Sequence, residues 1–548
     1  MKHIPALTPV AAALLIAGSA FAQQAPDAGR LLRENAAPAL QAPLPAPAIT
    51  IAPSDKRTPA GGAKVQLKAV TISGNTIFTQ AELLAVLGDF GKEALDLAGL
   101  DALAARLTAH YQAAGYPFAR AYLPAQAIDD GKLGIEVVEG RYGQVQATGE
   151  PAFIQPAQGF LSPLQPGKVI TSGALERATL LLNDQPGAKV EPLVRPGQAV
   201  GTGDLIVDVQ RYQPYSGDIG LDNHGNRFTG RHRARLNLNA NSPFMLGDQV
   251  TLQSLVTEGG MWFGALGYNA PLGSSGLRGR VGYTHSYYAL GGDFSSLQAS
   301  GTADVLSAGL SYPVLRSQRA NLTLSASLDH KRLHDLQRST GSDGDKRSNV
   351  LPLSLNFDLR DRMGRAGLTY GTISASVGHL SLDSALGATD AASARSAGSF
   401  SKLNLDVARI QSVTERVDLY ARITGQWAGK NLDSSEKFGL GGINGVRAYP
   451  SGEGYGDSGL LAQVELRHTM GDWMPFAFFD AGSVRISQHP WATGSNQRSI
   501  AGPGLGVRYA HGAWSGGVTV AWRSNGGMPR SDAQADSPVL WANLQKRF

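Results

Sequence analysis

The residues best suited to form a specific polar interaction are an arginine in a glycine-rich stretch and an aspartate in a later apolar stretch. Residues 439–459 read Gly-Leu-Gly-Gly-Ile-Asn-Gly-Val-Arg-Ala-Tyr-Pro-Ser-Gly-Glu-Gly-Tyr-Gly-Asp-Ser-Gly, with Arg447 and Tyr449 near the centre. Glycine-dense backbone follows folded-back paths closed to other residues, and a long loop within an ordered domain is usually functional. Asp480 is the only carboxylate of the apolar stretch 476–482. We therefore expect Arg447 to hold a folded-back loop against Asp480.

The other polar residues form no catalytic or metal-binding pattern. The chain has no cysteine, so neither a disulfide framework nor a thiolate metal site is available. Its 11 histidines show no paired spacing, and Asp222 with His224 reads as a polar hairpin tip. The Gly-x-Gly-x-Gly stretch 502–506 lies in an expected strand and does not open a helix, which excludes a dinucleotide site. We predict that the protein is not an enzyme and needs no metal or cofactor.

Length and composition predict an exported chain of several domains. A length of 548 residues exceeds that of one ordinary domain. Residues 1–22 have a basic start, an apolar centre and a small-residue end, which is typical of a cleaved signal peptide. No later apolar segment is long enough for a spanning helix. The net charge of +5 is spread along the chain, so nucleic-acid binding is not indicated. A glycine-rich chain of this kind can still lie in a membrane as a barrel.

Residues 23–62 have almost no capacity to form a core. A short amphipathic helix is expected within residues 27–39, where Leu31, Leu32 and Arg33 stand together. Six prolines between residues 38 and 59 predict an extended, semi-rigid tether. The alternative interpretation is a disordered tail.

Two small α/β modules are expected next, at residues 63–140 and 141–213. In the first, the pattern predicts strand 65–73, helices 79–87 and 100–114, and strands 118–123 and 132–138, the order β-α-α-β-β. In the second, it predicts strand 145–148, helix 173–182, and strands 189–195 and 205–211. Two repeated modules ahead of a larger domain are typical of a periplasmic adaptor arrangement.

Residues 214–548 predict a transmembrane antiparallel β-barrel. Short segments alternate apolar with polar residues, most regularly at 353–360, and turn residues separate them. In a membrane barrel the apolar face meets lipid while the polar face lines a wet lumen. If the first strand rises from the periplasm, the glycine-rich loop is the sixth extracellular loop. We expect sixteen strands, beginning near Tyr215, Arg231, Asp248, Met261, Leu277, Ser300, Ala320, Ser348, Gly367, Phe400, Val417, Gly459, Pro475, Ile500, Ser515 and Val539.

Two motifs within this arrangement carry a family resemblance. Val446-Arg447-Ala448-Tyr449 is similar to a Val-Arg-Gly-Tyr/Phe tetrad, and residues 478–482 match Phe-x-Asp-x-Gly. With the helix, the paired modules and the barrel, they make the chain resemble the TpsB transporters of two-partner secretion (the ShlB/FhaC/HecB type). The resemblance covers nearly all of the mature chain. Ala448 departs from the tetrad, which puts the fine geometry of the loop tip in question.

The resemblance implies a site for each part of the chain. It implies that the two modules are POTRA domains. It also implies that the glycine-rich loop folds into the barrel, where Arg447 pairs with Asp480. We use the name loop latch for the four residues Val446, Arg447, Tyr449 and Asp480. The resemblance makes Leu31, Leu32 and Arg33 part of a plug helix that occupies the resting pore. The POTRA domains would capture substrate by β-augmentation. The candidate contact residues are Leu103, Leu107, Leu175, Leu182 and Val190, although an internal core role is the simpler interpretation of each.

The resemblance also implies export of a large unfolded TpsA-type exoprotein through the outer membrane, without a nucleotide. Adhesin, haemolysin, contact-dependent toxin and protease payloads are all compatible with it. The other partners would be outer-membrane lipid and, during biogenesis, the barrel-assembly machinery, with no nucleic acid. The POTRA domains would lie in the periplasm of a Gram-negative bacterium. The main alternative function is that of an outer-membrane protein assembly factor. The alternative role of the loop latch is purely structural, with no part in transport. A passive porin would not need the periplasmic modules.

Overall fold

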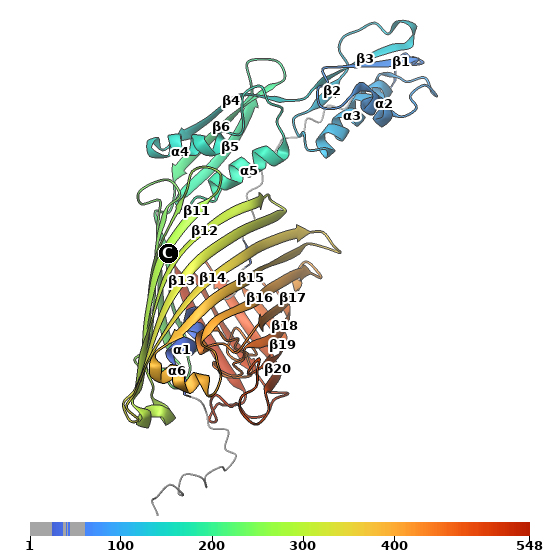
Figure 1. Ribbon diagram of the computed structural model, residues 1–548. Coiled ribbons are helices and arrows are strands. Elements are labelled where there is room, and N and C mark those ends of the chain that lie inside the picture. Colours follow the sequence, from blue (N-terminus) through green and yellow to red (C-terminus); the bar gives the residue numbers. More distant parts are fainter. Residues whose placement is uncertain (1–24, 37–39, 41, 44–60) are drawn as a thin grey trace, which may run out of the picture.

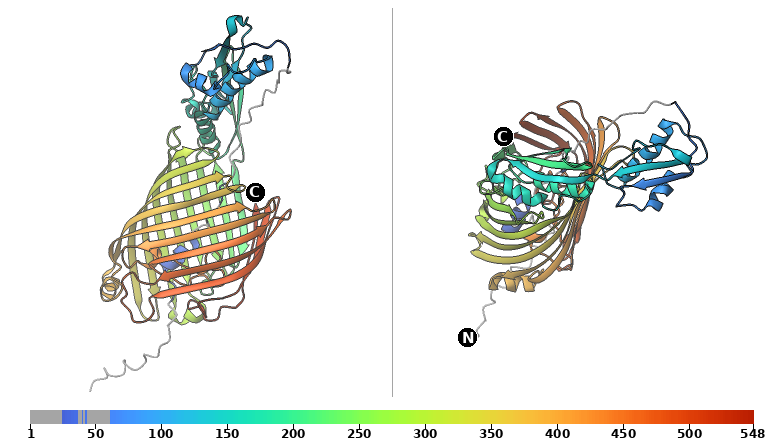
Figure 2. Two further views of the ribbon diagram at one scale, coloured as in Figure 1. Left: turned by 90° about the vertical axis from the view of Figure 1, so that its right-hand side faces the viewer. Right: turned by 90° about the horizontal axis from the view of Figure 1, so that it is seen from above.

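The computed structural model describes residues 25–36, 40, 42–43 and 61–548 (Figure 1). The expected signal peptide and most of the expected tether lie outside the described residues. The described chain forms two α/β modules that stand on one rim of a barrel, with a short helix inside the barrel (Figures 1 and 2). No helix in the described ranges combines the length and the apolar character needed to cross a bilayer.

The first module packs two helices against a sheet of order β1-β3-β2. Thr79 and Glu82 form the expected reciprocal capping box at the start of the first of these helices. The core gathers Leu83, Leu107 and Ile135, which are almost fully buried. The elements are β1 Ala69–Ser73, α2 Gln80–Leu87, α3 Leu97–Ala113, β2 Arg120–Tyr122, the short 3-10 turn η1 Asp129–Gly131 and β3 Lys132–Val138.

The second module repeats this plan with a sheet of order β4-β6-β5. Its first helix is absent from the elements expected from the sequence, because Pro156 inside it argues against a helix. Pro151 occupies the first turn, where the missing N–H does no harm, and Phe153 packs into the module core. The elements are β4 Arg141–Gly149, α4 Pro151–Leu161, α5 Ser172–Asn183, β5 Ala188–Pro196 and β6 Thr202–Arg211.

Glu139 joins the two modules, since only Glu139 and Gly140 separate β3 from β4. Its buried carboxylate accepts hydrogen bonds from the backbone N–H of Thr76 at 2.6 Å and of Ile77 at 2.8 Å. It also accepts one from the Tyr111 hydroxyl and pairs with Arg141 of the second module at 3.1 Å. Burial raises the pKa of Glu139, but these hydrogen bonds outweigh it and hold the pKa below its ordinary value of 4.5.

The described part of the chain contains a closed barrel of sixteen strands, as the sequence predicts. Each strand pairs antiparallel with its neighbours in sequence, and β22 closes the barrel on β7. Most strands begin within a few residues of the expected positions, whereas β14 begins at Ser342 and not near Ser348. The strands are β7 Tyr215–Asp222, β8 Arg233–Asn241, β9 Gln249–Thr257, β10 Trp262–Pro271, β11 Arg278–Ala289, β12 Ala299–Arg316, β13 Ala320–Gln337, β14 Ser342–Asp361, β15 Gly367–Leu382, β16 Gly398–Ser412, β17 Val417–Ala428, β18 Ser458–His468, β19 Trp473–Arg485, β20 Gln497–His511, β21 Trp514–Ala521 and β22 Val539–Arg547.

Along each strand, successive side chains point alternately to the lipid and to the lumen. On β13, Leu324 and Leu328 are about half exposed on the outer face, while Lys331 and Leu333 on the inner face contact groups inside the barrel. Helix α1 (Ala28–Ala36) lies in the lumen (Figure 2). The extracellular loops carry η2 Gly292–Leu297, α6 Ser384–Ala391 and η3 Ser434–Glu436.

Replacing Glu139 by Ala should destabilise the first module by about 2 kcal/mol, because two backbone N–H groups and a tyrosine hydroxyl lose their acceptor. The measurement is a urea titration of the full-length protein, read by proteolysis of the periplasmic modules. Because the folded pKa lies below the ordinary value, the contribution of Glu139 is present above pH 4.5 and is lost as the pH falls through the folded pKa. Glu139→Gln should flatten this pH dependence, and an unchanged profile would contradict the assignment.

Candidate functional site in the barrel lumen

The loop between β17 and β18, residues 429–457, turns back into the barrel and is named here loop 6. Its tip is held by packing, since Val446, Ala448 and Tyr449 are fully buried in a cluster with side chains of β18 to β20. The backbone of Val446 donates to the carbonyl of Leu440 at 2.7 Å, which closes the turn. Gly454 has a φ of +66°, a conformation that a side chain would strain. The glycine-rich sequence therefore forms a compact, buried hairpin-like turn.

Arg447 and Asp480 form a bidentate ion pair between the tip of loop 6 and β19. Arg447 Nε donates to Asp480 Oδ2 at 2.8 Å, and Nη2 donates to Oδ1 at 2.7 Å. The backbone N–H of Arg447 also donates to Oδ2, at 3.1 Å. Arg447 is 3% exposed and Asp480 is 0% exposed, so both charges are withdrawn from water. A pair of this geometry is stronger and more directional than a surface ion pair.

A second carboxylate, Glu465 on β18, shares the guanidinium. Arg447 Nη1 donates to Glu465 Oε1 at 2.5 Å, and Arg508 and Arg467 hold the other side of that carboxylate at 3.0 and 2.7 Å. The guanidinium also lies over the ring of Phe478, 3.6 Å from its centroid. Motif matching missed Glu465. The signal that could have found it is the alternation on β18, which puts Glu465 on the inner face, opposite the exposed Val464 and Leu466.

The rest of the loop tip is fixed to the last strands of the barrel. Tyr449 donates its hydroxyl to the carbonyls of Asn525 and Gly527 at 2.7 and 2.9 Å. Trp541 Nε1 donates to the carbonyl of Arg447 at 2.8 Å. Ala448 does not have a positive φ, and its methyl group lies where a side chain at Gly502 would be, with only 2.4 Å to that position. The missing side chain at residue 502 accommodates the alanine, so the departure from the tetrad causes no backbone strain.

Helix α1 packs across the lumen between the barrel wall and loop 6. Leu31 and Leu32 are buried against Met261, Tyr288 and Leu333 of the wall. On the other side, Arg30 donates to the carbonyl of Gly452 in loop 6 at 2.5 Å and lies over the ring of Tyr455. A side chain at residue 452 would collide with the Arg30 guanidinium.

Charged groups anchor the start of α1. Asp27 pairs with Lys346 of β14 at 3.0 Å and accepts a hydrogen bond from the Ser434 hydroxyl at 2.7 Å. Burial raises the pKa of Asp27, but Lys346 and the hydrogen bonds lower it further than burial raises it. The carboxylate therefore stays ionised, and Lys346 is also paired with Asp433 at 3.1 Å.

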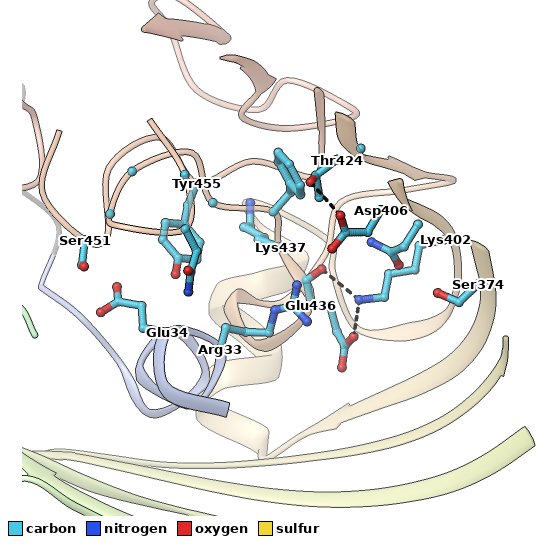
Figure 3. A pocket seen from close by; sticks show the side chains of 18 of the residues that line it. Arg33, Glu34, Ser374, Lys402, Asp406, Thr424, Glu436, Lys437, Ser451 and Tyr455 are labelled. Carbon is cyan, nitrogen blue, oxygen red and sulfur yellow. Dashed lines mark hydrogen bonds and ion pairs between the residues drawn. The ribbon is translucent and has the colours of Figure 1, made fainter. Parts of the chain in front are cut away.

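A cavity of about 520 Å³ lies beside α1 and loop 6 (Figure 3). Arg33 and Glu34 of the helix enter it from one side, and Lys402 and Glu436 form a buried pair at 2.7 Å on the other. Burial raises the pKa of Glu436, but Lys331 and Lys402 lower it to about 2. The cavity thus holds a buried, ionised carboxylate, and no three described His, Cys, Asp or Glu residues are grouped to bind a metal ion.

Of the five residues suggested as POTRA contacts, four leucines lie in the module cores, which is the simpler interpretation given above, and Val190 of β5 is partly buried. Leu103, Leu107, Leu175 and Leu182 are between 0% and 3% exposed, and Val190 packs partly against the second core. Helical periodicity marks residues that face a sheet, so the same signal selects core residues and not the open surface.

The fold and the lumen define the class of this protein: an outer-membrane β-barrel transporter with periplasmic POTRA domains. A family model described as haemolysin secretion/activation protein ShlB/FhaC/HecB matches residues 201–509. A second, described as POTRA domain, ShlB-type, matches residues 65–140. The chain belongs to the ShlB/FhaC/HecB family, whose members are the outer-membrane transporters of two-partner secretion.

Named relatives and solved structures agree with this membership. The heme/hemopexin transporter protein HuxB of Haemophilus influenzae (strain 86-028NP) is 26% identical over 85% of this chain and 84% of that protein. The outer membrane transporter CdiB of Escherichia coli is 24% identical over 86% and 82%. The solved structure of CdiB from Escherichia coli aligns with a TM-score of 0.70 and 22% identity over 91% of this chain and 93% of that one. BamA from Haemophilus ducreyi lacking POTRA domains 1–3 shares the fold, with a TM-score of 0.52 and 13% identity over 88% of this chain and 100% of that one.

Replacing Arg447 by Ala should destabilise the attachment of loop 6 by about 3–5 kcal/mol, because Asp480 then stays buried without its cation and Glu465 keeps only Arg467 and Arg508. The measurement is the temperature at which the folded barrel loses its shifted mobility in unboiled gels, combined with protease cleavage of loop 6. The matched control is Arg409→Ala, which removes a bidentate pair with Asp361 at 2.9 Å whose side chains are 28% and 24% exposed. Because that pair is open to water, its removal should have a much smaller effect, and equal effects of both variants would contradict the prediction.

Proposed function

We propose that this transporter exports one large partner exoprotein, in unfolded form, from the periplasm through the barrel to the cell surface. The observation that carries the proposal is a lumen filled by two removable or movable parts, α1 and loop 6, in a barrel preceded by POTRA domains. The relatives named above are a heme/hemopexin transporter and CdiB transporters. The proposal assigns the chain no catalytic activity and no nucleotide. Its other partners are outer-membrane lipid and, while the barrel inserts, the barrel-assembly machinery.

The loop latch sets the conformation of loop 6 in which the pore can pass a chain. Five hydrogen bonds to residues of three strands hold Arg447 and its backbone, so the tip of loop 6 has one well-defined position. An alternative role as a staple that only stabilises the barrel makes a different prediction: export would then follow barrel abundance in every variant.

Helix α1 acts as a plug that leaves when substrate arrives. Its nine residues form too short a helix to be stable alone in water, so its structure depends on contacts in the lumen. Its ion pairs and hydrogen bonds can be replaced by water when the helix leaves. The expected tether would keep the displaced helix near the pore.

The POTRA domains receive the exoprotein at their free sheet edges. Strands β2 and β5 stand at the ends of their sheets, and an extended peptide can add to such an edge. Tyr122 of β2 and Leu193 of β5 are 36% and 46% exposed, which offers apolar side chains beside each edge. These two edges replace the buried leucines as the contact sites in the proposal.

The function is tested by comparing the proteins of the medium and the outer membrane with and without this gene, complemented by the wild type or by Arg447→Ala. Dedicated export is expected to remove one large protein from the surface and medium while other barrels keep their abundance. A broad loss of outer-membrane barrels would instead support the assembly factor. Loss of export at normal abundance of the Arg447→Ala barrel would assign the loop latch to transport and not to stability alone.

A cross-link between α1 and the barrel should block export. Asn35 Nδ2 lies 3.7 Å from Met261 Sδ, and the chain has no cysteine, so Asn35→Cys with Met261→Cys introduces the only thiols. A short bismaleimide joining them should reduce secretion about tenfold or more, because the helix can no longer leave the pore. Each single variant treated with the same reagent is the control. Undiminished secretion by the fully cross-linked protein would show that α1 stays in place during export.

A further inference from the structure

Four neighbouring strands change from apolar to polar at one height on the outer face of the barrel. In the extracellular half of β12, β13, β14 and β15, the last exposed apolar residues are Leu306, Leu328, Leu351 and Val377. The next outward residue toward the extracellular end of each strand is polar: Asp304, His330, Asn349 and His379. This change marks the height at which hydrocarbon gives way to lipid headgroups. The strands lie side by side in the wall (Figure 2).

Two arginines lie directly opposite each other at the headgroup level. Arg332 of β13 and Arg347 of β14 are register partners, both exposed on the outer face. Like charges directly opposite each other in an antiparallel pair are destabilising. Within the described chain, neither guanidinium lies within ion-pair distance of a carboxylate; Arg332 Nε donates to His330 Nε2 at 3.1 Å. The two guanidiniums therefore lie side by side at the membrane surface without an ion-pair partner in the described chain.

The neighbouring acids form no ion pair with these arginines and hydrogen-bond to other groups. Asp304 faces Arg332 across β12, but it already accepts from the Tyr283 hydroxyl and pairs with His285 at 2.7 Å. Asp345, nearer the extracellular end, pairs with His334 at 3.3 Å, and Asp343 pairs with it at 3.5 Å. Because no described carboxylate lies within ion-pair distance of Arg332 or Arg347, the terminal N–H groups of both guanidiniums are free to bind an external anion.

A hollow of about 600 Å³ lies beside the arginine pair on the same outer face. Leu328, Leu351 and Val377 form its apolar side, at the height of the hydrocarbon. Asn349, His379 and Lys430 form its polar side, and Arg347 is the next outward residue after Asn349 on β14. The polar side of the hollow thus faces the extracellular end of the barrel and its apolar side faces the membrane interior, which is the orientation of a lipid in the outer leaflet.

We propose that this surface is a binding site for a phosphorylated glycolipid of the lipid A type. A phosphate lies between Arg332 and Arg347, where each guanidinium can donate two parallel hydrogen bonds. An acyl chain lies over Leu351 and Val377 in the hollow, and Asn349 and Lys430 at its polar side hydrogen-bond to sugar hydroxyls. This proposal depends on the location of the barrel in the outer membrane and does not depend on the proposed export function.

The test is native mass spectrometry of the purified full-length protein with bisphosphorylated lipid A, with dephosphorylated lipid A, and with inorganic phosphate as competitor. Wild type should bind the bisphosphorylated lipid, and Arg332→Gln with Arg347→Gln should bind it at least about tenfold more weakly. Arg362→Gln with Arg365→Gln removes the same charge from the exposed periplasmic turn between β14 and β15 and should bind as wild type does. Equal binding by all three proteins would overturn the site, and competition by equimolar inorganic phosphate would reduce it to a free-phosphate site.

Thermal unfolding provides a second measurement that does not depend on the double variant. In detergent without lipid A, Arg347→Gln should leave the unfolding temperature unchanged or raise it, because a like-charge contact is removed. With lipid A present, the same variant should unfold below wild type, because wild type gains more from the bound lipid. A variant that is equally less stable in both conditions would show that Arg347 has a structural role and would contradict the proposal. Secretion assays are independent of either result.

Discussion

The buried guanidinium of Arg447 is the interaction around which loop 6 and the last strands of the barrel are arranged. A charge at this depth is tolerated only when several partners replace its water. Asp480 and Glu465 supply the two carboxylates, Phe478 supplies a ring face, and Trp541 binds the backbone carbonyl. The partners come from β18, β19 and β22, so the position of one loop residue depends on the correct closure of the barrel.

The sequence predicts the barrel well because its signal is repeated in every strand. Period-two alternation and turn residues recur, so an error at one boundary, such as the start of β14, does not change the count. Asp480 is recognisable because a lone carboxylate in an apolar strand needs a partner. Glu465 is not recognisable from a motif, because a glutamate on the polar face of a lumen strand looks like any other solvated residue until loop 6 is folded over it.

The sequence is less informative about the POTRA domains, where two physical effects are confounded. An apolar residue at helical spacing signals burial, and Leu107 and Leu182 are buried accordingly. Recognition of an extended chain depends instead on unpaired backbone at a sheet edge, which no residue type marks. Helix α4 was missed for a related reason, since Pro156 opposes a helix locally while the packing of Phe153 and Phe160 against the sheet favours one. Tertiary burial outweighs the local preference.

The two parts that fill the lumen differ in how firmly they are held, and this difference fits their proposed roles. Helix α1 buries a few small and aliphatic side chains and otherwise makes polar contacts whose atoms can return to water. The tip of loop 6 is held by a buried charge pair that nothing replaces when it is broken. Arg30 touches loop 6 at Gly452, near the base of the loop, and not at Arg447. Departure of α1 therefore removes a contact from the base of loop 6 while the tip keeps all of its partners. If α1 leaves the pore as proposed, the loop latch need not break, and any further movement of loop 6 would need a separate input, such as the passing chain itself.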